Sequence, residues 1–306
     1  MINKDFNSIL ELLKAFPDEQ ACIDHLEELR WDGHVVSPFD PTSKVYRCKN
    51  NRFKCKNTGK YFNVRTGTLF DNTKIELRKW FLAIWLVTSH KKGISSLQLH
   101  RDLCVTQKTA WFMLQRIRKC FGIENHNDLD NDVEADETYV GGKNKNRHKN
   151  KKVKSSQGRS AKDKTPVVGI IERGGKLNAQ KVDNVQKETL STLVINSVKE
   201  SANLYTDEWV GYNGLDKMHN HSIVHHGQGE FVNGDTHTNT LEGFWSLLKH
   251  GIIGIYHFVS RKHLQNYVDE FVFRYNTREY TESGRINHLL SNMCVRTTYR
   301  RLVHGC

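Results

Sequence analysis

From about residue 130 onward, short apolar stretches with a period of two alternate with stretches of helical period, and this pattern restricts the fold most. Strands and helices that follow one another in this way are typical of an α/β domain. Two further helices are predicted from about Thr238. The strands are predicted at Asp132–Val140, Thr165–Glu172, Leu177–Val182 and Leu204–Trp209, with a helix at Lys187–Ser201.

Three acidic residues lie on these elements: Asp136 on the first strand, Asp207 near the end of the fourth, and Glu242 at the start of a helix. Carboxylates from separate segments can hold two divalent metal ions, about 3.5–4 Å apart, that clamp the attacking and leaving oxygens of a phosphodiester. Mg²⁺ prefers such oxygen ligands. Each acid alone is more often a turn, capping or helix-dipole residue, so the predicted catalytic role depends on their combination.

The neighbours of these acids refine the prediction. Asp136 and Glu137 are adjacent on a strand and point to opposite faces, so only one of them can face a shared metal. Lys249 lies on the same helical face as Glu242, at i+7, where a compact cation can contact a DNA phosphate.

The chain is strongly basic, with 46 Lys and Arg against 34 Asp and Glu in 306 residues, which favours nucleic acid as the partner. The run Lys143–Lys164 holds ten Lys or Arg and one acid, Asp163. Such a run is either a solvated hairpin loop or an arm that orders on DNA phosphates, and its place directly after Asp136 favours the arm. The residues of this arm that we expect to contact DNA are Lys145, Arg147, Lys151 and Lys152.

The segment Ile94–Lys119 has the pattern of a helix-turn-helix, although an ordinary helical hairpin would look the same. A first helix is predicted near Ser96–Leu103, a tight turn at Cys104 and Val105, and a second helix capped by Thr106. Its predicted buried stripe is Ala110, Met113, Leu114 and Ile117. The side chains left for bases or backbone are Gln107, Lys108, Thr109 and Arg116.

Neither a membrane span nor a disulfide framework is indicated. No run of 18 apolar residues occurs, the N-terminus lacks a signal-peptide pattern, and the seven cysteines are scattered and odd in number. We expect a soluble cytoplasmic protein, associated with the nucleoid.

The motifs around the acids resemble the signature segments of bacterial DDE transposases, specifically the ISXO2-like insertion-sequence group related to the eukaryotic Merlin elements. Further matching segments lie in the helical region, at Trp80–Ile84, Lys91–Leu99 and Gln107–Leu114. The motifs around the acids are ADETYVGG at Ala135–Gly142, YTDEW at Tyr205–Trp209 followed by Gly211 and Tyr212, and HTNTLEGFWSLLK at His237–Lys249.

The resemblance covers about residues 20–280 and implies an RNase H-like catalytic domain that depends on two Mg²⁺ ions, with Mn²⁺ able to substitute. By position, Asp136, Asp207 and Glu242 would be the catalytic and metal-holding residues, and Lys249 matches a lysine that often follows the third acid. The implied partners are double-stranded DNA, as terminal inverted repeats and as target, and further copies of the chain in a homo-oligomer.

One departure from the family concerns the N-terminal zinc ribbon, which usually has two Cys-x-x-Cys knuckles. Here the first knuckle aligns with Ser37–Asp40 and has no cysteine, and the second keeps Cys55 but has Thr58 as its partner. Structural zinc needs four Cys or His ligands, and only Cys22, Cys48, Cys55 and His34 or His25 could supply them, at irregular spacing. We expect a zinc-free ribbon of β structure, with a small core of Phe39, Tyr46, Tyr61 and Phe62.

The expected architecture is therefore α/β: an RNase H-like catalytic domain preceded by a degenerate ribbon module and a helix-turn-helix. Its parts are a helical segment (1–30), the ribbon-like module (31–70), the helix-turn-helix domain (71–125), the catalytic domain (130–285) and a tail (286–306). The predicted function is metal-dependent cleavage and strand transfer of an insertion sequence at its inverted repeats. The alternatives are a non-catalytic, sequence-specific DNA-binding protein and a nuclease of the same fold without joining activity.

Overall fold

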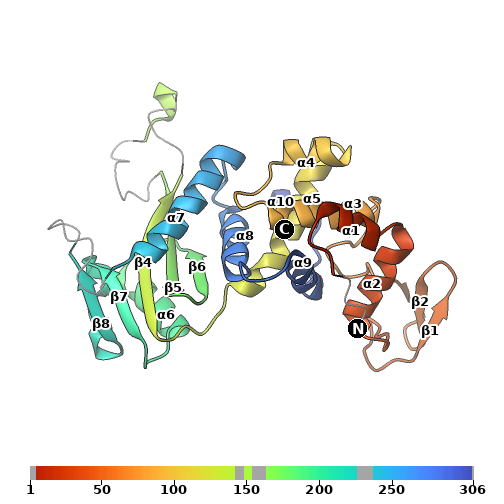
Figure 1. Cartoon of the computed structure of the whole chain (residues 1–306), viewed down its shortest axis with the longest axis horizontal. Helices are drawn as coiled ribbons and strands as arrows, with labels where there is room; N and C mark the ends of the chain where they lie inside the picture. The colour runs from red at the N-terminus through yellow and green to blue at the C-terminus, as the bar shows by residue number, and fades with distance from the viewer. Residues whose placement is uncertain (1–4, 142–147, 154–162, 226–236, 305–306) are drawn as a thin grey trace. The chain divides into compact units, whose positions relative to one another are not determined.

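A computed structural model of the chain describes residues 5–141, 148–153, 163–225 and 237–304 (Figure 1). The chain divides into two compact units, one of Met1–Cys120 with Glu279–Cys306 and the other of Phe121–Arg278. The first unit thus combines residues from both ends of the sequence, whereas the second is continuous and contains all three candidate acids. Among the described residues, no helix combines the length and the apolar character needed to cross a membrane.

The first unit is mostly helical. Its helices are α1 (Ile9–Ala15), α2 (Glu19–Trp31), α3 (Leu77–Ser89), α4 (Ser96–Leu103), α5 (Gln107–Phe121), α9 (Glu282–Ser291) and α10 (Tyr299–His304). The ring of Phe16 lies 4.7 Å from that of Phe81, which joins the N-terminal helices to α3. A hydrogen bond of 2.9 Å between His25 Nε2 and Asn287 Oδ1 links α2 to α9. Residues near the C-terminus are therefore part of this unit's core.

A small antiparallel sheet follows α2, in the order β1-β2-β3. Its strands are β1 (Val45–Cys48), β2 (Arg52–Cys55) and β3 (Tyr61–Phe62). Phe53 and Phe62 point inward and pack against Trp31 of α2, with ring centroids 5.2 and 6.1 Å away. A small apolar core therefore forms in this module.

The predicted membership of that core was wrong in three of four places. Phe62 is buried, but Phe39, Tyr46 and Tyr61 are 40, 43 and 50% exposed. The alternation of β2 places Phe53 on the inner face, and the tyrosines paired across the sheet consequently point outward.

The second unit is built on a five-stranded mixed sheet in the order β6-β5-β4-β7-β8. The strands are β4 (Asp132–Val140), β5 (Thr165–Glu172), β6 (Leu177–Lys181), β7 (Asn203–Asp207) and β8 (Asn220–Val224). The β4–β5 and β5–β6 pairs are antiparallel, whereas the β4–β7 and β7–β8 pairs are parallel. The predicted α/β class is confirmed.

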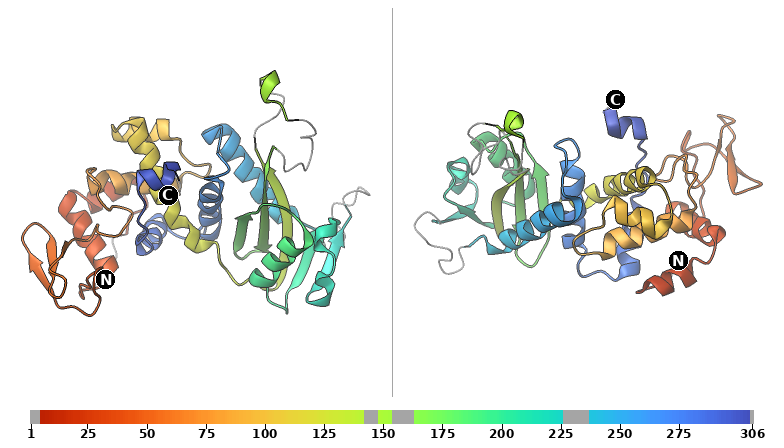
Figure 2. Two further views of the ribbon diagram at one scale, coloured as in Figure 1. Left: turned by 180° about the vertical axis from the view of Figure 1, so that it is seen from behind. Right: turned by 90° about the horizontal axis from the view of Figure 1, so that it is seen from above.

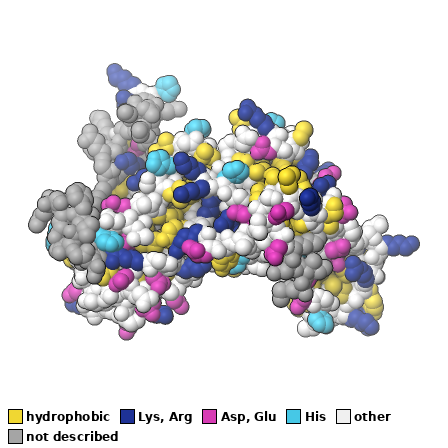
Figure 3. All heavy atoms as spheres, viewed as in Figure 1, with side chains coloured by type: hydrophobic (Ala, Val, Ile, Leu, Met, Phe, Trp, Pro, Cys, Tyr) yellow, Lys and Arg dark blue, Asp and Glu magenta, His cyan; other side chains and the backbone are white. Residues whose placement is uncertain are grey.

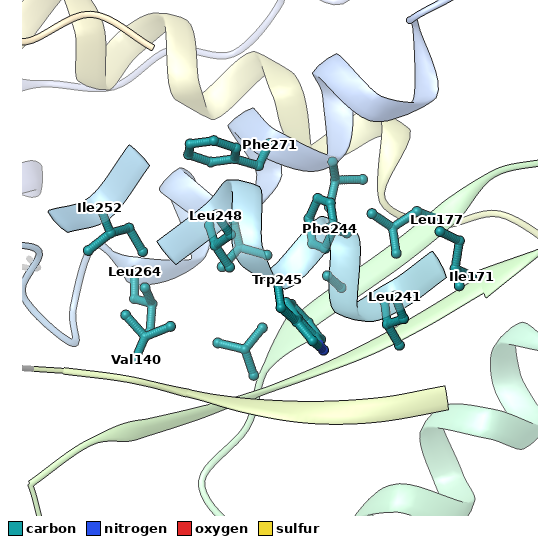
Figure 4. Close-up of a cluster of buried hydrophobic side chains, with 14 residues drawn as sticks. Val140, Ile171, Leu177, Leu241, Phe244, Trp245, Leu248, Ile252, Leu264 and Phe271 are labelled. Carbon is teal, nitrogen blue, oxygen red and sulfur yellow. The ribbon is translucent and has the colours of Figure 1, made fainter. Parts of the chain in front are cut away.

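Helices cover both faces of this sheet (Figures 1 and 2). They are α6 (Lys187–Ser197), α7 (Asn239–Gly251) and α8 (Leu264–Asn276), with short helical turns at Gly122–Glu124, Lys149–Lys151, Val210–Tyr212 and Leu215–Lys217 and a π-helical turn at Ile252–Tyr256. Val133 and Ala135 pack with α6 on one face. On the other face Val140 packs with α7 and α8, in the cluster that Figure 4 shows. Odd-numbered and even-numbered residues of β4 thus face the helices on opposite sides of the sheet.

The predicted bounds of the first two strands agree with β4 and β5. The predicted helix after β6 ends earlier than expected, at Ser197. β8 was not predicted, because it begins with three polar residues and only Val224 is fully buried.

Candidate active site

Asp136 and Asp207 lie on one face of the sheet, at corresponding places on neighbouring strands. The parallel ladder pairs Asp132 with Asn203 and Glu134 with Tyr205, and two residues further along, β4 and β7 reach Asp136 and Asp207. Alternate residues of a strand share a face. The hydrogen bond of 3.1 Å from the Tyr205 hydroxyl to Asp132 Oδ1 shows that these two sets of side chains face the same way. Both candidate carboxylates are therefore directed toward the α7 side.

Helix α7 is bonded directly to Asp136. The indole Nε1 of Trp245 donates to Asp136 Oδ2 at 3.0 Å, and Glu242 lies three residues earlier on the same helix. Figure 4 shows the Trp245 ring extending from α7 toward the strands. The hydrogen bond holds Glu242, which is exposed, on the side of the sheet that carries the two aspartates.

The electrostatics of Asp136 reflect both acidic partners. The pKa of its carboxyl is raised from 3.8 to about 6, first by burial and then by the negative charge of Asp207, with a smaller contribution from Glu242. Hydrogen bonds from the Glu137 backbone and from Trp245 act in the opposite direction. The other two acids predicted from the sequence thus both act electrostatically on Asp136.

The close approach of Trp245 depends on a glycine. Gly169 is the β5 partner of Asp136, and a Cβ at this position would lie 2.6 Å from Trp245 Cζ2 and 2.9 Å from Leu241 Cδ1. Any larger residue would push α7 away from the sheet, so the absent side chain leaves room for the indole.

A buried acid that sequence reasoning did not single out fixes the start of α7. Glu134 is fully buried, and its carboxylate accepts hydrogen bonds from Thr240 Oγ1 (2.8 Å) and the Leu241 amide (2.9 Å). Arg173 Nε donates to the same carboxylate at 2.8 Å, and its Nη2 donates to the His237 carbonyl at 2.8 Å. A carboxylate is favoured at a helix N-terminus, and here Arg173 compensates its buried charge. In the sequence, the one indication of a role for Glu134 was that it shares a strand face with Asp136.

Glu137 belongs to the opposite face. The Tyr212 hydroxyl donates to Glu137 Oε2 at 3.1 Å, and the pKa of Tyr212 is raised by burial and then by the charges of Glu137, Asp136 and Asp207. Of the two adjacent acids, Asp136 is therefore the one on the side of Asp207 and α7.

The donor set suits hard divalent cations, because carboxylate oxygens are their preferred ligands and the mutual repulsion of these acids would be relieved by a bound positive charge. In the described ranges, however, no three His, Cys, Asp or Glu side chains form a ready metal-binding group. The predicted carboxylates are coupled electrostatically without being gathered into one three-ligand cluster. The same finding applies to the cysteines and histidines considered for zinc.

The helical pair predicted for DNA reading is present at the expected positions. α4 is capped by Ser95, and Thr106 Oγ1 accepts from the Thr109 amide at 3.2 Å at the start of α5. Gln107 and Lys108 are exposed, and Thr109 is half-buried. The predicted buried stripe on α5 is confirmed. A DNA-reading role for this pair stays a prediction.

The structure corrects the prediction that the Arg116 side chain is left free to contact DNA. This side chain is buried, and its guanidinium donates to the carbonyls of Leu69 (2.9 Å) and Thr297 (3.1 Å). Its role is to join separate segments of the first unit, so it does not face DNA.

Of the other residues predicted to contact DNA, the structure describes only some. Lys249 is exposed on α7, and Lys152 is exposed after the helical turn Lys149–Lys151. Lys145 and Arg147 lie outside the described residues, and the side chain of Lys151 is likewise not described.

Comparisons with known proteins agree on a family. Residues 128–276 match the family model of the ISXO2-like transposase domain. A protein of Halobacterium salinarum, "Uncharacterized protein in transposable element ISH50", is 30% identical over 275 residues, covering 86% of this chain and 92% of that protein.

Two solved structures were also matched. The Mos1 strand transfer complex is 12% identical with a TM-score of 0.30, covering 68% of this chain and 73% of that one. The pre-cleavage Mos1 transpososome is 11% identical with a TM-score of 0.27, covering 71% and 80%.

Proposed function

The chain belongs to the ISXO2-like transposase family, and from this premise we propose that it cleaves DNA at the ends of an insertion sequence and joins the freed 3′ ends to target DNA. Asp136, Asp207 and Glu242 are the proposed catalytic and metal-holding residues. The observation that carries the proposal is the placement of Asp136: it lies two residues beyond the paired Glu134 as Asp207 lies two beyond Tyr205, is bonded to the helix of Glu242, and has its pKa raised by burial and by the charges of both acids.

The proposed domain type is RNase H-like. Its support is the strand order β6-β5-β4-β7-β8, in which β5 is antiparallel to both neighbours and β4, β7 and β8 run in one direction. This order places the two aspartates on adjacent central strands and lets a later helix supply the third acid.

Two Mg²⁺ ions, when bound, would activate the attacking oxygen and neutralise the charge that develops on the phosphate. The protein's own contribution is positioning. Trp245 fixes one Asp136 oxygen, Glu134 and Arg173 fix the first turn of α7, and Gly169 sets the separation of helix and sheet. Asp136 is mostly ionised only above a pH of about 6, which is the form that holds a cation.

Double-stranded DNA, as inverted repeats and as target, is the proposed substrate, and a homo-oligomer on DNA is the proposed assembly. The proposed contacts are Gln107, Lys108 and Thr109 at the start of α5, Lys249 on α7, and the arm residues Lys145, Arg147, Lys151 and Lys152. The lysine and arginine contacts pair opposite charges and are therefore sensitive to salt.

A non-catalytic DNA-binding protein is the second candidate, and two observations favour it. Glu242 is exposed, and the described residues contain no ready three-ligand metal group. A nuclease without joining activity would use the same acids and would differ only in the second step.

The test is cleavage and joining of DNA that carries the inverted repeats flanking the gene, in Mg²⁺ and in Mn²⁺. Wild type is compared with Asp136→Asn, Asp207→Asn and Glu242→Gln, and with Glu137→Gln as the matched control from the opposite face. We expect loss of both steps in the first three variants with DNA binding retained, and activity in the control. Binding without cleavage by the wild type would support the second candidate, and cleavage without joining would support the nuclease.

A further inference from the structure

The small sheet of the first unit has an unusual charge distribution. Between residues 44 and 60 the chain has seven Lys or Arg and no Asp or Glu. Within the described residues only Arg47 of these has an acidic partner, Glu27, at 3.2 Å. Figure 3 shows dark blue side chains around the edge that carries β1 and β2. The seven cations are Lys44, Arg47, Lys49, Arg52, Lys54, Lys56 and Lys60.

Two tyrosines and a lysine form a row across the outer face of this sheet. Tyr46 on β1 pairs with Lys54 on β2, and Lys54 pairs with Tyr61 on β3. Directly paired residues project on the same side of a sheet, so the two rings flank the lysine. Tyr46 and Tyr61 are 43 and 50% exposed, whereas Phe53, Cys55 and Phe62 of the same sheet are buried.

Cations surround these rings. The guanidinium of Arg52 lies 4.5 Å from the Tyr61 ring centroid, and the amines of Lys54 and Lys44 lie 5.6 Å from Tyr61 and 5.7 Å from Tyr46. In these cation–π contacts the positive groups lie over the rings, which are still 43 and 50% exposed.

The rings are not needed for the core of the module. Phe53, Phe62 and Trp31 fill the inner side, and Cys55, at a former knuckle position, is fully buried. Burial alone would raise the pKa of the Cys55 thiol, but hydrogen bonds with Ser37, Ser43 and Thr58 lower it to about 6. Polar contacts thus occupy the place of zinc ligands, and the outer tyrosines are available for another role.

We propose that this outer face binds single-stranded DNA, with bases stacked on Tyr46 and Tyr61 and phosphates held by the surrounding Lys and Arg side chains. Positive charge alone would serve duplex and single strand equally, because both present phosphates. Exposed aromatic faces add affinity only for unpaired bases, since duplex bases are already stacked on one another. The absence of acids between residues 44 and 60 disfavours a basic protein partner. The inference is independent of catalysis by the three acids.

The test measures binding of the full-length protein to a labelled oligothymidine strand and to a duplex that carries the inverted repeat, in EDTA so that no cleavage occurs. We expect Tyr46→Ala with Tyr61→Ala to weaken single-strand binding roughly tenfold or more and to leave duplex binding unchanged, because each stacked base contributes to affinity. Tyr61→Phe with Tyr46→Phe keeps both rings and should bind as the wild type does. Tyr280→Ala is the matched control, since Tyr280 is also 40% exposed but lies outside this face.

A second measurement covers the case in which the alanine variant fails to fold, as judged by circular dichroism. Arg52→Gln with Lys54→Gln should flatten the salt dependence of single-strand binding by about 0.7 per lost phosphate contact, in a logarithmic plot. Unchanged single-strand affinity in a folded tyrosine variant would overturn the proposal. Equal losses of affinity for the single strand and the duplex would also overturn it, because they would show that the surface binds phosphates and does not stack on bases. Neither result would bear on the cleavage assay.

Discussion

The indole nitrogen of Trp245 lies 3.0 Å from Oδ2 of Asp136, so the helix that carries the third acid is hydrogen-bonded to the strand that carries the first. A donor to an ionised carboxylate forms one of the stronger hydrogen bonds in proteins. This bond therefore connects α7 to β4 and lowers the pKa of Asp136, against the larger upward effects of burial and of Asp207.

Replacing Trp245 by Phe removes the donor and keeps most of the apolar ring. Because the hydrogen bond lowers the pKa of Asp136, its loss should move the acidic limb of the pH–activity profile to higher pH. Misplacement of Glu242 should also lower the cleavage rate by roughly one to two orders of magnitude. Single-turnover cleavage between pH 5.5 and 9 checks both effects, and an unchanged acidic limb would show that the bond does not influence the reacting groups.

Asp136→Asn should make the protein more stable at neutral pH. The pKa of Asp136 is higher in the folded protein, about 6, than its usual 3.8, so ionisation destabilises the fold as pH rises through this window. Asparagine avoids that cost, which corresponds to about 3 kcal/mol at pH 7.5. Urea unfolding in EDTA should show this advantage at pH 7.5 and its disappearance near pH 4. A destabilised variant at pH 7.5 would contradict the assigned direction of the pKa shift.

Gly169→Ala should separate α7 from the sheet. The new methyl group would meet the Trp245 ring at 2.6 Å, and overpacking of this kind costs about 1–3 kcal/mol. Gly243→Ala is the matched control for stability, because nothing lies within 4 Å of its added Cβ and alanine is the better helix former. Chemical denaturation should show a loss for the first variant and a gain of up to about 1 kcal/mol for the second. Equal stabilities would mean that α7 shifts without cost.

Arg173→Met should destabilise the second unit strongly, because the fully buried carboxylate of Glu134 would lose the guanidinium that it pairs with. Removing one partner of a buried ion pair costs about 3–5 kcal/mol. The exposed pair of Lys199 and Asp130 provides the control, and Lys199→Met should cost less than about 1 kcal/mol. Glu134→Leu combined with Arg173→Met should recover part of the loss in a double-mutant cycle. Additive losses would show that the two side chains act independently.

Much of the second unit could be predicted because its signals are local. β5 has an apolar centre, Val167–Ile171, and β4 begins with apolar residues that alternate with acids, so both strands have a recognisable pattern in the sequence. The face of α7 could be predicted for the same reason. β8 could not, because this edge strand begins with three polar residues and forms only through its pairing with β7.

The errors concern information that is not local. Helical phase assigned Arg116 to the surface, but its partners, the carbonyls of Leu69 and Thr297, are 47 and 181 residues away in sequence. The strand pattern around Tyr46 and Tyr61 showed alternation without showing which set faces inward, and the position of Trp31 decides that. Glu134 resembled any acid near a strand start until the start of α7 was placed upon it.

The first unit is assembled from both ends of the chain, and this affects both the folding of the nascent protein and the fate of truncated gene copies. Its core includes residues after Glu279, which leave the ribosome only when the whole second unit has been made. The nascent chain can therefore complete the segment with the three candidate carboxylates before it completes the unit that carries the helical pair. A gene copy with a stop codon shortly before Glu279 would encode every candidate catalytic acid and still lack α9, which packs against the N-terminal helices. Such copies would lose the folded first unit before they lose the triad.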